Sequence, residues 1–384
     1  MPSPTYDVII AGAGPVGLTL ALALSRANKK VLLLEQKKTL SRHSRAPAIW
    51  PRTQEILDKI AVSKPFQREG IKVRTLKLWD TDNDQSLVEF PIHLLKNETK
   101  FPHLLVLPQN RTERLLLTEL KKEKNTKVLF NASLESFRQN KSSVTAKYRH
   151  NGRLKTATAQ YLIGCDGAHS VVRKKLRFKL HGETYDTKAA LADIRLTGEK
   201  KFKSPRLTTK GQPIVAIMIA DGLWRFIIPF HSHHKVDLTK VVKEGAKYLF
   251  GNVKYRSIWK SEFSLHRRLS SKFVKGRIAL AGDAAHLNSP AGGQGMNAGM
   301  KDADILSTLL LEALETEDPK VLKKYSERRD QINKGVNKFT NTLTKFLFYK
   351  EGKALRLVMA FARLLIKLPF FKKRLLRRLA MLKD

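Results

Sequence analysis

The chain has 384 residues, of which 42% are hydrophobic, so it can bury a sizeable core and is not a generally disordered protein. Its single cysteine, Cys165, excludes an internal disulfide and suits a reducing cytoplasm. A formal net charge of +39 favours polyanionic partners, either nucleic acid or an anionic membrane surface, although a uniformly basic source proteome would give the same balance.

The two kinds of membrane-directed segment are not evident. No basic segment precedes the first apolar run at the N-terminus, so we expect no secretory signal. No stretch stays uncharged over the length that a membrane-spanning helix needs. We therefore expect a cytoplasmic protein, and peripheral attachment to the inner face of the membrane remains an open alternative.

The first recognisable unit is a strand, a helix and a second strand within residues 7–36. Asp7–Ile10 is a short apolar strand, Pro15 opens an apolar helix, and Asn28 can end that helix in a left-handed conformation. The intervening turn has the GxGxxG spacing that lets backbone approach a pyrophosphate, and an acid closes the second strand where it can accept a ribose hydroxyl. The alternative is an ordinary glycine-rich turn. We predict dinucleotide binding by Gly12, Gly14, Gly17 and Glu35.

The next segment, residues 72–108, reads as strands. Its acidic stretch Asp80–Gln85 has oxygen donors at alternate positions, as in a calcium loop. It lacks the glycine at the sixth position, and Pro91 occupies the twelfth, so we interpret it as a hairpin turn. Residues 109–123 then predict a helix with Leu115, Leu116 and Leu120 at apolar spacing.

The remaining chain alternates strands and turns before it becomes helical. Residues 161–167 and 277–285 are buried strands, residues 183–270 are strand-rich, and a helix follows from about Met296. The run His231–His234 has no carboxylate or cysteine partner at a recognisable spacing, so we interpret it as a surface turn and predict no metal site.

Two later glycine-bearing turns repeat the arrangement of the first one. Gly164–Gly167 and Gly282–Gly295 each follow a buried strand and place an aspartate beside a glycine. Ligands of open α/β sheets bind beyond the carboxyl ends of the strands, so we expect one extended cofactor to lie across all three turns. Asp283 can bind a polyol hydroxyl, and the helix that opens after GGQGMN offers free N–H groups to the negative charge of a reduced flavin.

Three motifs carry a family resemblance: GAGPVG…LLLEQ, GCDGAHSVVRKKL and GDAAHLNSPAGGQGMNAGMKDAD. Their order resembles that of the class A flavoprotein aromatic hydroxylases, which include para-hydroxybenzoate hydroxylase, phenol hydroxylase and the polyketide hydroxylases. The resemblance implies an α/β fold: a glutathione-reductase-like FAD-binding Rossmann domain with an inserted mixed β-sheet substrate domain and C-terminal helices. The implied boundaries are 1–71, 104–182 and 271–330 for the FAD-binding domain, 72–103 and 183–270 for the substrate domain, and 331–384 for basic C-terminal helices.

The resemblance also implies which residues hold FAD. They are Gly12, Gly14, Pro15, Gly17 and Glu35 at the ADP half, Arg45 near the pyrophosphate, Gln109 and Asp283 along the ribityl chain, Asp166 and Gly167 in the motif that serves both FAD and NAD(P)H, and Pro290, Gly293, Gly295, Met296 and Asn297 along the isoalloxazine through backbone groups.

The implied reaction is hydroxylation of an aromatic or quinol-like small molecule. In this family NADPH or NADH reduces FAD, O2 adds to the flavin as a hydroperoxide, and the distal oxygen passes to the substrate ring. A second GxGxxG is absent, which fits transient binding of the nicotinamide. No general acid or base is assigned, because packing or surface roles are favoured for the candidates in the presumed substrate domain, which are Trp224, Arg225, Phe226, Tyr255 and His266.

Two other functions stay open. A flavin oxidoreductase that inserts no oxygen, of the isoprenoid-reductase or halogenase kind, would share the motifs; LWRFIIPF approaches the halogenase pattern WxWxIP but has phenylalanine at the second tryptophan. A non-catalytic flavin-bearing protein of the membrane surface is the alternative from another class.

The C-terminal segment is the most basic part of the chain. Residues 345–384 hold twelve Lys and Arg and two acids, a net of +10. At helical period the segment is apolar on one side and cationic on the other, and Pro369 divides it into two helices. Such helices can lie in a membrane interface or pack on the FAD domain. Nucleic-acid binding is disfavoured because no recognition fold accompanies the charge.

Overall fold

A computed structural model describes residues 5–42, 44, 46–197, 204–208, 212–233, 236–289, 291–329 and 368–382. Among the predicted positions, Arg45, His234, Pro290 and residues 331–367 lie outside these ranges.

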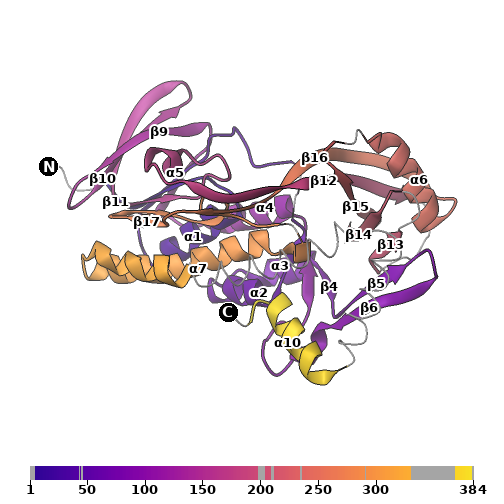
Figure 1. Ribbon diagram of the computed structural model, residues 1–384. Coiled ribbons are helices and arrows are strands. Elements are labelled where there is room, and N and C mark those ends of the chain that lie inside the picture. Colours follow the sequence, from indigo (N-terminus) through magenta and orange to yellow (C-terminus); the bar gives the residue numbers. More distant parts are fainter. Residues whose placement is uncertain are drawn as a thin grey trace.

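The first sheet has eight strands with a parallel centre. Its apolar strands pack between helices on both faces, as expected for parallel strands that read as continuous apolar runs. Helices α1 (Pro15–Arg26) and α7 (Gly295–Glu315) lie along one face, and the short α5 (Val171–Lys175) lies on the other (Figure 1). The path runs β17 (Val274–Lys275), β18 (Ile278–Leu280), β11 (Arg153–Gly164), β1 (Tyr6–Ala11), β2 (Val31–Leu34) and β8 (Thr126–Leu129), while β9 (Ala132–Gln139) and β10 (Val144–His150) form a hairpin against β11.

The predicted first unit is confirmed in detail. β1, α1 and β2 follow one another as expected, and Asn28 has a φ of 61°, the left-handed conformation predicted for the end of the helix. The predicted helix at 109–123 is α4 (Gln109–Leu120), which packs beside α1 and buries Leu116 and Leu120.

The second sheet also has eight strands and is mainly antiparallel. Residues 183–270 are strand-rich as predicted, but α6 (Leu238–Phe250) interrupts them and was not predicted. The Asp237 side chain accepts hydrogen bonds from the backbone N–H groups of Thr239 and Lys240, which caps α6 at its start. The strand order is β19 (His286–Leu287), β16 (Lys254–Ser270), β12 (Leu180–Thr197), β15 (Leu223–His231), β14 (Ile214–Ala220), β13 (Arg206–Thr208), β5 (Thr75–Asp80) and β6 (Gln85–Pro91).

A small third sheet joins the two large ones. It consists of β3 (Ala48–Ile49), β7 (Leu104–Val106) and β4 (Ile71–Val73). The chain nearby forms α2 (Pro51–Lys59), α3 (Ser63–Glu69) and the 3-10 turn η1 (Ile92–Leu95), the last of which lies in a segment predicted to be strand. Further 3-10 turns are η2 (Gly282–Ala284), η3 (Ala291–Gly293) and η4 (Pro319–Leu322), and the last described helix is α10 (Pro369–Leu379).

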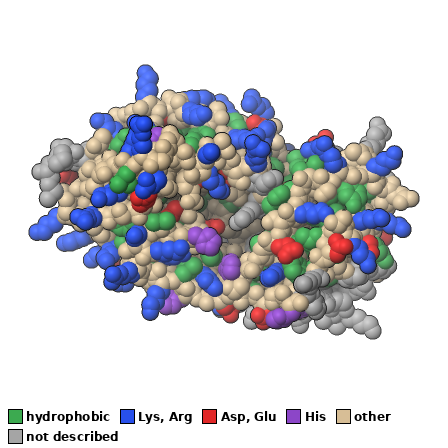
Figure 2. Space-filling view, turned by 90° about the horizontal axis from the view of Figure 1, so that it is seen from above, with side chains coloured by type: hydrophobic (Ala, Val, Ile, Leu, Met, Phe, Trp, Pro, Cys, Tyr) green, Lys and Arg blue, Asp and Glu red, His purple; other side chains and the backbone are tan. Residues whose placement is uncertain are grey.

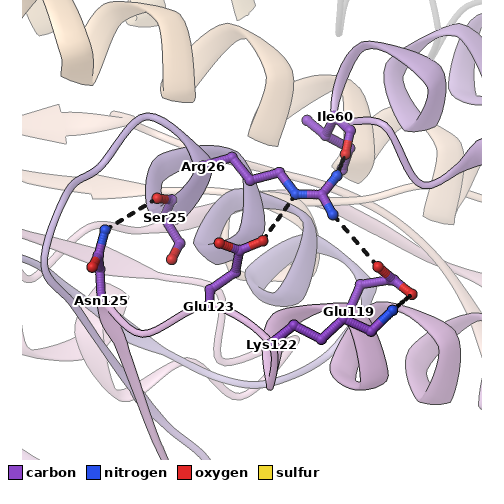
Figure 3. A network of polar contacts seen from close by, with 7 residues as sticks. All are labelled: Ser25, Arg26, Ile60, Glu119, Lys122, Glu123 and Asn125. Carbon is purple, nitrogen blue, oxygen red and sulfur yellow. Dashed lines mark hydrogen bonds and ion pairs between the residues drawn. The ribbon is translucent and has the colours of Figure 1, made fainter.

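Arg26, in the last turn of α1, connects three elements on the surface (Figure 3). Its Nε donates to Glu123 at 3.1 Å, its Nη2 donates to Glu119 at 3.5 Å, and its Nη1 donates to the carbonyl of Ile60. These side chains are partly exposed, so the ion pairs contribute little beside the apolar packing of α1 on α4.

The charge is distributed rather than gathered in one patch. Figure 2 shows Lys and Arg side chains scattered over the whole of one face, around a hollow near its middle. Within the ranges that the structure describes, no helix is long and apolar enough to cross a membrane.

The structure also tests the two segments that suggested metal sites. Asp80–Gln85 forms the β5–β6 hairpin turn as predicted, and the Asp80 carboxylate accepts hydrogen bonds from the Asp82 N–H and the Asn83 side chain. His231 is exposed at the end of β15. No group of three or more possible ligands that could hold a metal occurs among the described residues.

Candidate active site

The three glycine-bearing turns meet at one edge of the first sheet, as predicted. In the strand register, Ala11 at the end of β1 pairs with Leu34 of β2 on one side and Gly164 of β11 on the other. Gly164 in turn pairs with Leu280 of β18. The turns that follow these strands therefore start side by side at the carboxyl ends of the parallel strands, where α/β sheets bind ligands.

A cavity of about 1360 Å³ opens from this edge toward the second sheet. Single small-molecule sites occupy roughly 300–1,000 Å³, so this volume suits a dinucleotide together with a second molecule. Predicted site residues that line the cavity are Gly14, Pro15, Glu35, Gln109, Gly167, Asp283, Gly293, Gly295 and Met296.

The glycines of the motifs divide into two physical classes. A Cβ on Gly12 would lie 2.3 Å from the Cys165 carbonyl oxygen, and one on Gly17 would lie 2.0 Å from that of Gly12. These two glycines are needed by the fold itself. A Cβ on Gly14, Gly167 or Gly295 would meet no atom of the described residues within 4 Å, because each faces the cavity. One glycine from each turn therefore leaves room for a ligand in the cavity.

The first turn presents donors and an acid to the cavity. Gly14 precedes α1, and no described side chain caps the free N–H groups of that helix. Such an N-terminus binds phosphate. The Glu35 carboxylate accepts hydrogen bonds from the backbone N–H of Ala13 at 2.8 Å and of Lys37 at 2.9 Å. The acid therefore lies directly beside the glycine turn.

The third turn points the start of a second helix into the cavity. Within the described part of the chain, no side chain caps the first N–H groups of α7, and Gly295 and Met296 line the cavity there. The turn is fixed from behind by Trp50, whose Nε1 donates to the Gly292 carbonyl at 2.9 Å. Asn297 is fully buried, and its side chain bonds the backbone of Trp50, Ala48 and Gly293. Its side chain thus holds the turn in place and does not line the cavity.

A buried acid of α7 holds the backbone of the third turn. Asp302 of α7 accepts hydrogen bonds at 2.7 Å from the Gly282 N–H and from the His286 ring, and Arg329 forms an ion pair with its other oxygen. Burial alone would raise the pKa of Asp302, but Arg329 and His286 outweigh it and hold the pKa below its ordinary value. The ionised carboxylate therefore fixes the backbone immediately before Asp283.

The second turn leads into a short helix. The Asp166 carboxylate accepts hydrogen bonds from the N–H groups of Val171 and Val172 at the start of α5, where Ser170 is the N-cap. Arg173, which the sequence analysis missed, donates to the carbonyls of Ala168 at 2.7 Å and Ala284 at 2.8 Å. It thereby connects the second turn to the third.

Gln109 lies at the start of α4, on the wall nearest Glu35. Its backbone N–H donates to the Ser44 hydroxyl, and its side chain donates to Glu113 at 2.8 Å. Burial raises the pKa of Glu113. The Gln109 amide is thus held by a carboxyl that also lines the cavity.

The second sheet turns one face to the cavity and the other to α6. Alternate side chains of a strand point to opposite faces. Even-numbered residues, among them Trp224 and Phe226, pack under α6, in agreement with the packing role favoured for them. Odd-numbered residues line the cavity: Leu191, Val215, Ile217, Arg225, Ile227, Pro229, Trp259, Ser261 and Phe263.

Arg225 lies on the cavity side of the sheet, unlike Trp224 and Phe226. It is 1% exposed and donates two hydrogen bonds of 2.8 Å to Asp193, directly opposite on β12. It also donates to the Ser44 carbonyl at 2.7 Å, and its guanidinium lies 5.8 Å from the centre of the Trp259 ring. An arginine inside an apolar strand was the signal that could have identified it.

Comparisons with known proteins agree with this geometry. A family model described as "FAD binding domain" matches residues 5–340. The chain is 30% identical over 369 residues to the uncharacterized aromatic compound monooxygenase YhjG of Bacillus subtilis, covering 92% of this chain and 72% of that protein. It is 27% identical over 335 residues to para-nitrophenol 4-monooxygenase of a Pseudomonas species, covering 85% and 83%.

Solved structures share the fold. The crystal structure of p-nitrophenol 4-monooxygenase PnpA from Pseudomonas putida superposes with a TM-score of 0.89 at 23% identity, covering 97% of this chain and 96% of that one. Aklavinone-11 hydroxylase, in a ternary complex with FAD and aklavinone, gives a TM-score of 0.82 at 22% identity, covering 91% and 70%.

Proposed function

The chain belongs to the FAD binding domain family, and from its site we infer that this FAD-dependent monooxygenase hydroxylates an aromatic or quinol-like small molecule. The observation that carries the inference is one continuous cavity, which the three cofactor turns and the apolar face of the second sheet share. The cofactor and the substrate would therefore lie in contact, with NADPH or NADH and O2 as co-substrates.

The residues of the edge fit FAD. The N-terminus of α1, with Gly14 and Pro15, would hold the pyrophosphate, and Glu35 would accept a ribose hydroxyl. Gln109 and Asp283 would lie along the ribityl chain. When bound, FAD supplies the two-electron exchange with the nicotinamide and the activation of O2 that protein side chains cannot perform.

The residues of the chain contribute to the reaction through electrostatic stabilisation and through the shape of the cavity. The N–H groups at the start of α7, at Gly295 and Met296, would stabilise negative charge at the flavin end of the cavity. With the cofactor and the substrate bound, the apolar walls would limit the access of water to the reacting centre. Asp302 and His286 act indirectly, because they hold the backbone that carries Asp283.

The lining points to an apolar aromatic substrate with one acidic hydroxyl. The walls are mostly aliphatic and aromatic side chains, including Leu191, Ile217 and Phe263. Arg225 places a guanidinium, ion-paired with Asp193, in this lining, where it would donate a hydrogen bond to a ring hydroxyl. The relative named para-nitrophenol 4-monooxygenase is named for a compound with one ring hydroxyl, which supports this substrate class.

We further propose that the N-terminal end of α10 rests on an anionic membrane surface. Leu368, Phe370 and Phe371 are 51%, 70% and 47% exposed, next to basic residues of the same helix. Apolar side chains flanked by cations suit the headgroup region. Sedimentation with anionic vesicles tests this: the Phe370→Ser/Phe371→Ser variant should lose binding, whereas equal binding to uncharged vesicles would contradict the proposal.

Anaerobic reduction of the FAD-loaded protein by NADPH or NADH tests the function. The visible flavin band should disappear slowly alone and much faster with one member of a panel of phenols, quinols and polycyclic hydroxyaromatics. Equally fast reduction without any of them would indicate a flavin oxidoreductase that does not require an aromatic substrate.

A further inference from the structure

Helix α10 forms part of the cavity wall, although it lies far beyond the third glycine turn in the sequence. Its side chains Leu375 and Leu379 line the same cavity as Gly293 and Met296. In Figure 1 the helix lies beneath the region of β4 and β6. The last described helix of the basic C-terminal segment thus contacts the cavity that the cofactor and the substrate would share.

The helix is docked mainly by apolar packing. Leu376 and Ala380 are buried against a cluster that includes Trp50, Ile92 and Leu95. Leu379 belongs to the same buried cluster and Leu375 packs against it, and both of these side chains also reach the cavity. The same apolar face of the helix therefore anchors it and contributes two leucines to the cavity wall.

Two polar contacts connect α10 to the site itself. The Gln294 side chain, directly before α7, donates to the Leu379 carbonyl at 3.1 Å. The backbone N–H of Arg52, at the start of α2, donates to the Ala380 carbonyl at 3.1 Å. Because Gln294 is part of the third turn, the position of α10 is coupled to the backbone that surrounds the expected flavin end.

An ion-pair cluster holds the outer side of the helix. Glu98 pairs with Arg377 and, at 3.3 Å, with Lys373. Its hydrogen bond with Arg377 lowers the pKa of Glu98 despite the opposing effect of partial burial. Exposed pairs of this kind contribute little to stability, so the apolar contacts fix the helix and the ion pairs orient its outer face.

We propose that α10 is the specificity-determining wall of the substrate cavity, and that Leu375 and Leu379 set the largest ring system that the cavity admits. This inference rests on the proposed function, because it assumes that an aromatic substrate occupies the cavity. A leucine side chain that faces a cavity limits the size of the ligand, and removing or adding a few carbon atoms there changes selectivity by roughly 10- to 200-fold.

The test compares three variants of the full-length, FAD-loaded protein. Leu375→Ala enlarges the cavity, Leu375→Trp reduces it, and Leu382→Ala is the control, since Leu382 packs on the same apolar cluster and does not line the cavity. Dissociation constants are measured from the flavin spectrum for hydroxylated aromatics of one to four fused rings, together with the thermal midpoint.

We expect the two Leu375 variants to change the preference for ring size in opposite directions. Leu375→Ala should favour the larger compounds over phenol by roughly tenfold or more, Leu375→Trp should disfavour them by a similar factor, and Leu382→Ala should keep the wild-type order. An unchanged order in both Leu375 variants, or a change in Leu382→Ala as large as theirs, would overturn the proposal.

A second probe separates this proposal from the function on which it rests. If no hydroxylated aromatic perturbs the wild-type flavin, the substrate class is wrong. The wall is then tested with N-phenyl-1-naphthylamine, an uncharged probe that fluoresces in apolar cavities. Its affinity should rise in Leu375→Ala and fall in Leu375→Trp by roughly tenfold. Equal affinity in all variants would overturn the role of α10.

Discussion

Arg225 and Asp193 face each other across β15 and β12, and the guanidinium donates to both carboxylate oxygens at 2.8 Å inside the cavity wall. Both side chains are almost fully buried. Such a pair costs desolvation energy, so it is weak evidence for stability, but it fixes the Arg225 guanidinium at a defined place in the cavity wall. The contribution of this pair to stability can therefore be measured separately from its contribution to ligand binding, by comparing single and double variants.

Arg225→Ala should lower the free energy of unfolding by about 3–5 kcal/mol, because it leaves the Asp193 carboxylate buried without this partner. The double variant Arg225→Met/Asp193→Leu should recover most of that stability in urea unfolding. It should nevertheless bind phenolic ligands at least about tenfold more weakly than the wild type. Full recovery of ligand affinity in the double variant would show that Arg225 has no role in binding.

Gly14→Val should abolish FAD binding without unfolding the protein. A Cβ at this position meets no atom of the described residues within 4 Å and projects into the cavity. We expect the FAD affinity to fall by at least about 100-fold, since the valine occupies the space that the pyrophosphate needs.

The matched comparison is Gly17→Ala, where the added Cβ would lie 2.0 Å from the Gly12 carbonyl oxygen. This variant should lower the thermal midpoint of the apoprotein itself, while that of Gly14→Val should stay close to wild type. Undiminished flavin content in Gly14→Val would remove the basis for placing the cofactor on the first turn.

Asp302→Asn should destabilise the third turn. The substitution removes the charge that faces Arg329 and His286, and breaking a buried pair in this way costs about 3–5 kcal/mol. The loss should appear in urea unfolding together with faster release of FAD. Asp304→Asn on the same helix is the control, because its pair with the exposed Lys59 should contribute only about 0–1 kcal/mol. Equal losses in both variants would contradict the supporting role of Asp302.

The stability of the protein should depend on His103 below neutral pH. Burial, followed by the charges of Lys72 and Arg74, lowers the pKa of His103 from 6.5 to about 4. Between these values the unfolded chain binds the proton more readily, so stability is lost as the pH falls from 6.5 toward 4.

The contribution of His103 to that loss is on the order of 2–3 kcal/mol. His103→Gln should flatten the dependence of the unfolding free energy on pH in this window, while leaving the slope above about pH 7 as in the wild type. An unaltered slope between pH 4 and 6.5 would show that His103 stays protonatable in the folded protein.

The sequence was sufficient to predict the cofactor edge, because local patterns determine it. Apolar runs ending in glycine mark the parallel strands, and the registers of Ala11, Leu34, Gly164 and Leu280 bring those ends together. The left-handed Asn28 and the Asp80–Gln85 turn were likewise predictable from local chemistry.

The side of the cavity that the second sheet and α10 form could not be predicted, because it depends on tertiary contacts that no local sequence pattern shows. Helix α6 covers one face of the second sheet, and α6 was not predicted. Because Trp224 and Phe226 pack under α6, their neighbour Arg225 faces the cavity. Leu375 reaches the cavity only because α10 docks on Trp50 and Ile92, which come much earlier in the chain. The Asp166 carboxylate accepts hydrogen bonds at the start of α5, which the motif alone did not show.

The fate of molecular oxygen distinguishes a monooxygenase from a flavin oxidoreductase that inserts no oxygen. The FAD-loaded protein would be incubated with NADPH or NADH, the aromatic compound that most accelerates flavin reduction, and 18O2, and the product would be analysed by mass spectrometry. A monooxygenase should give a hydroxylated product that carries one 18O atom, with the second oxygen atom recovered in water. Consumption of the nicotinamide with hydrogen peroxide as the sole oxygen product, and no labelled aromatic, would contradict this activity.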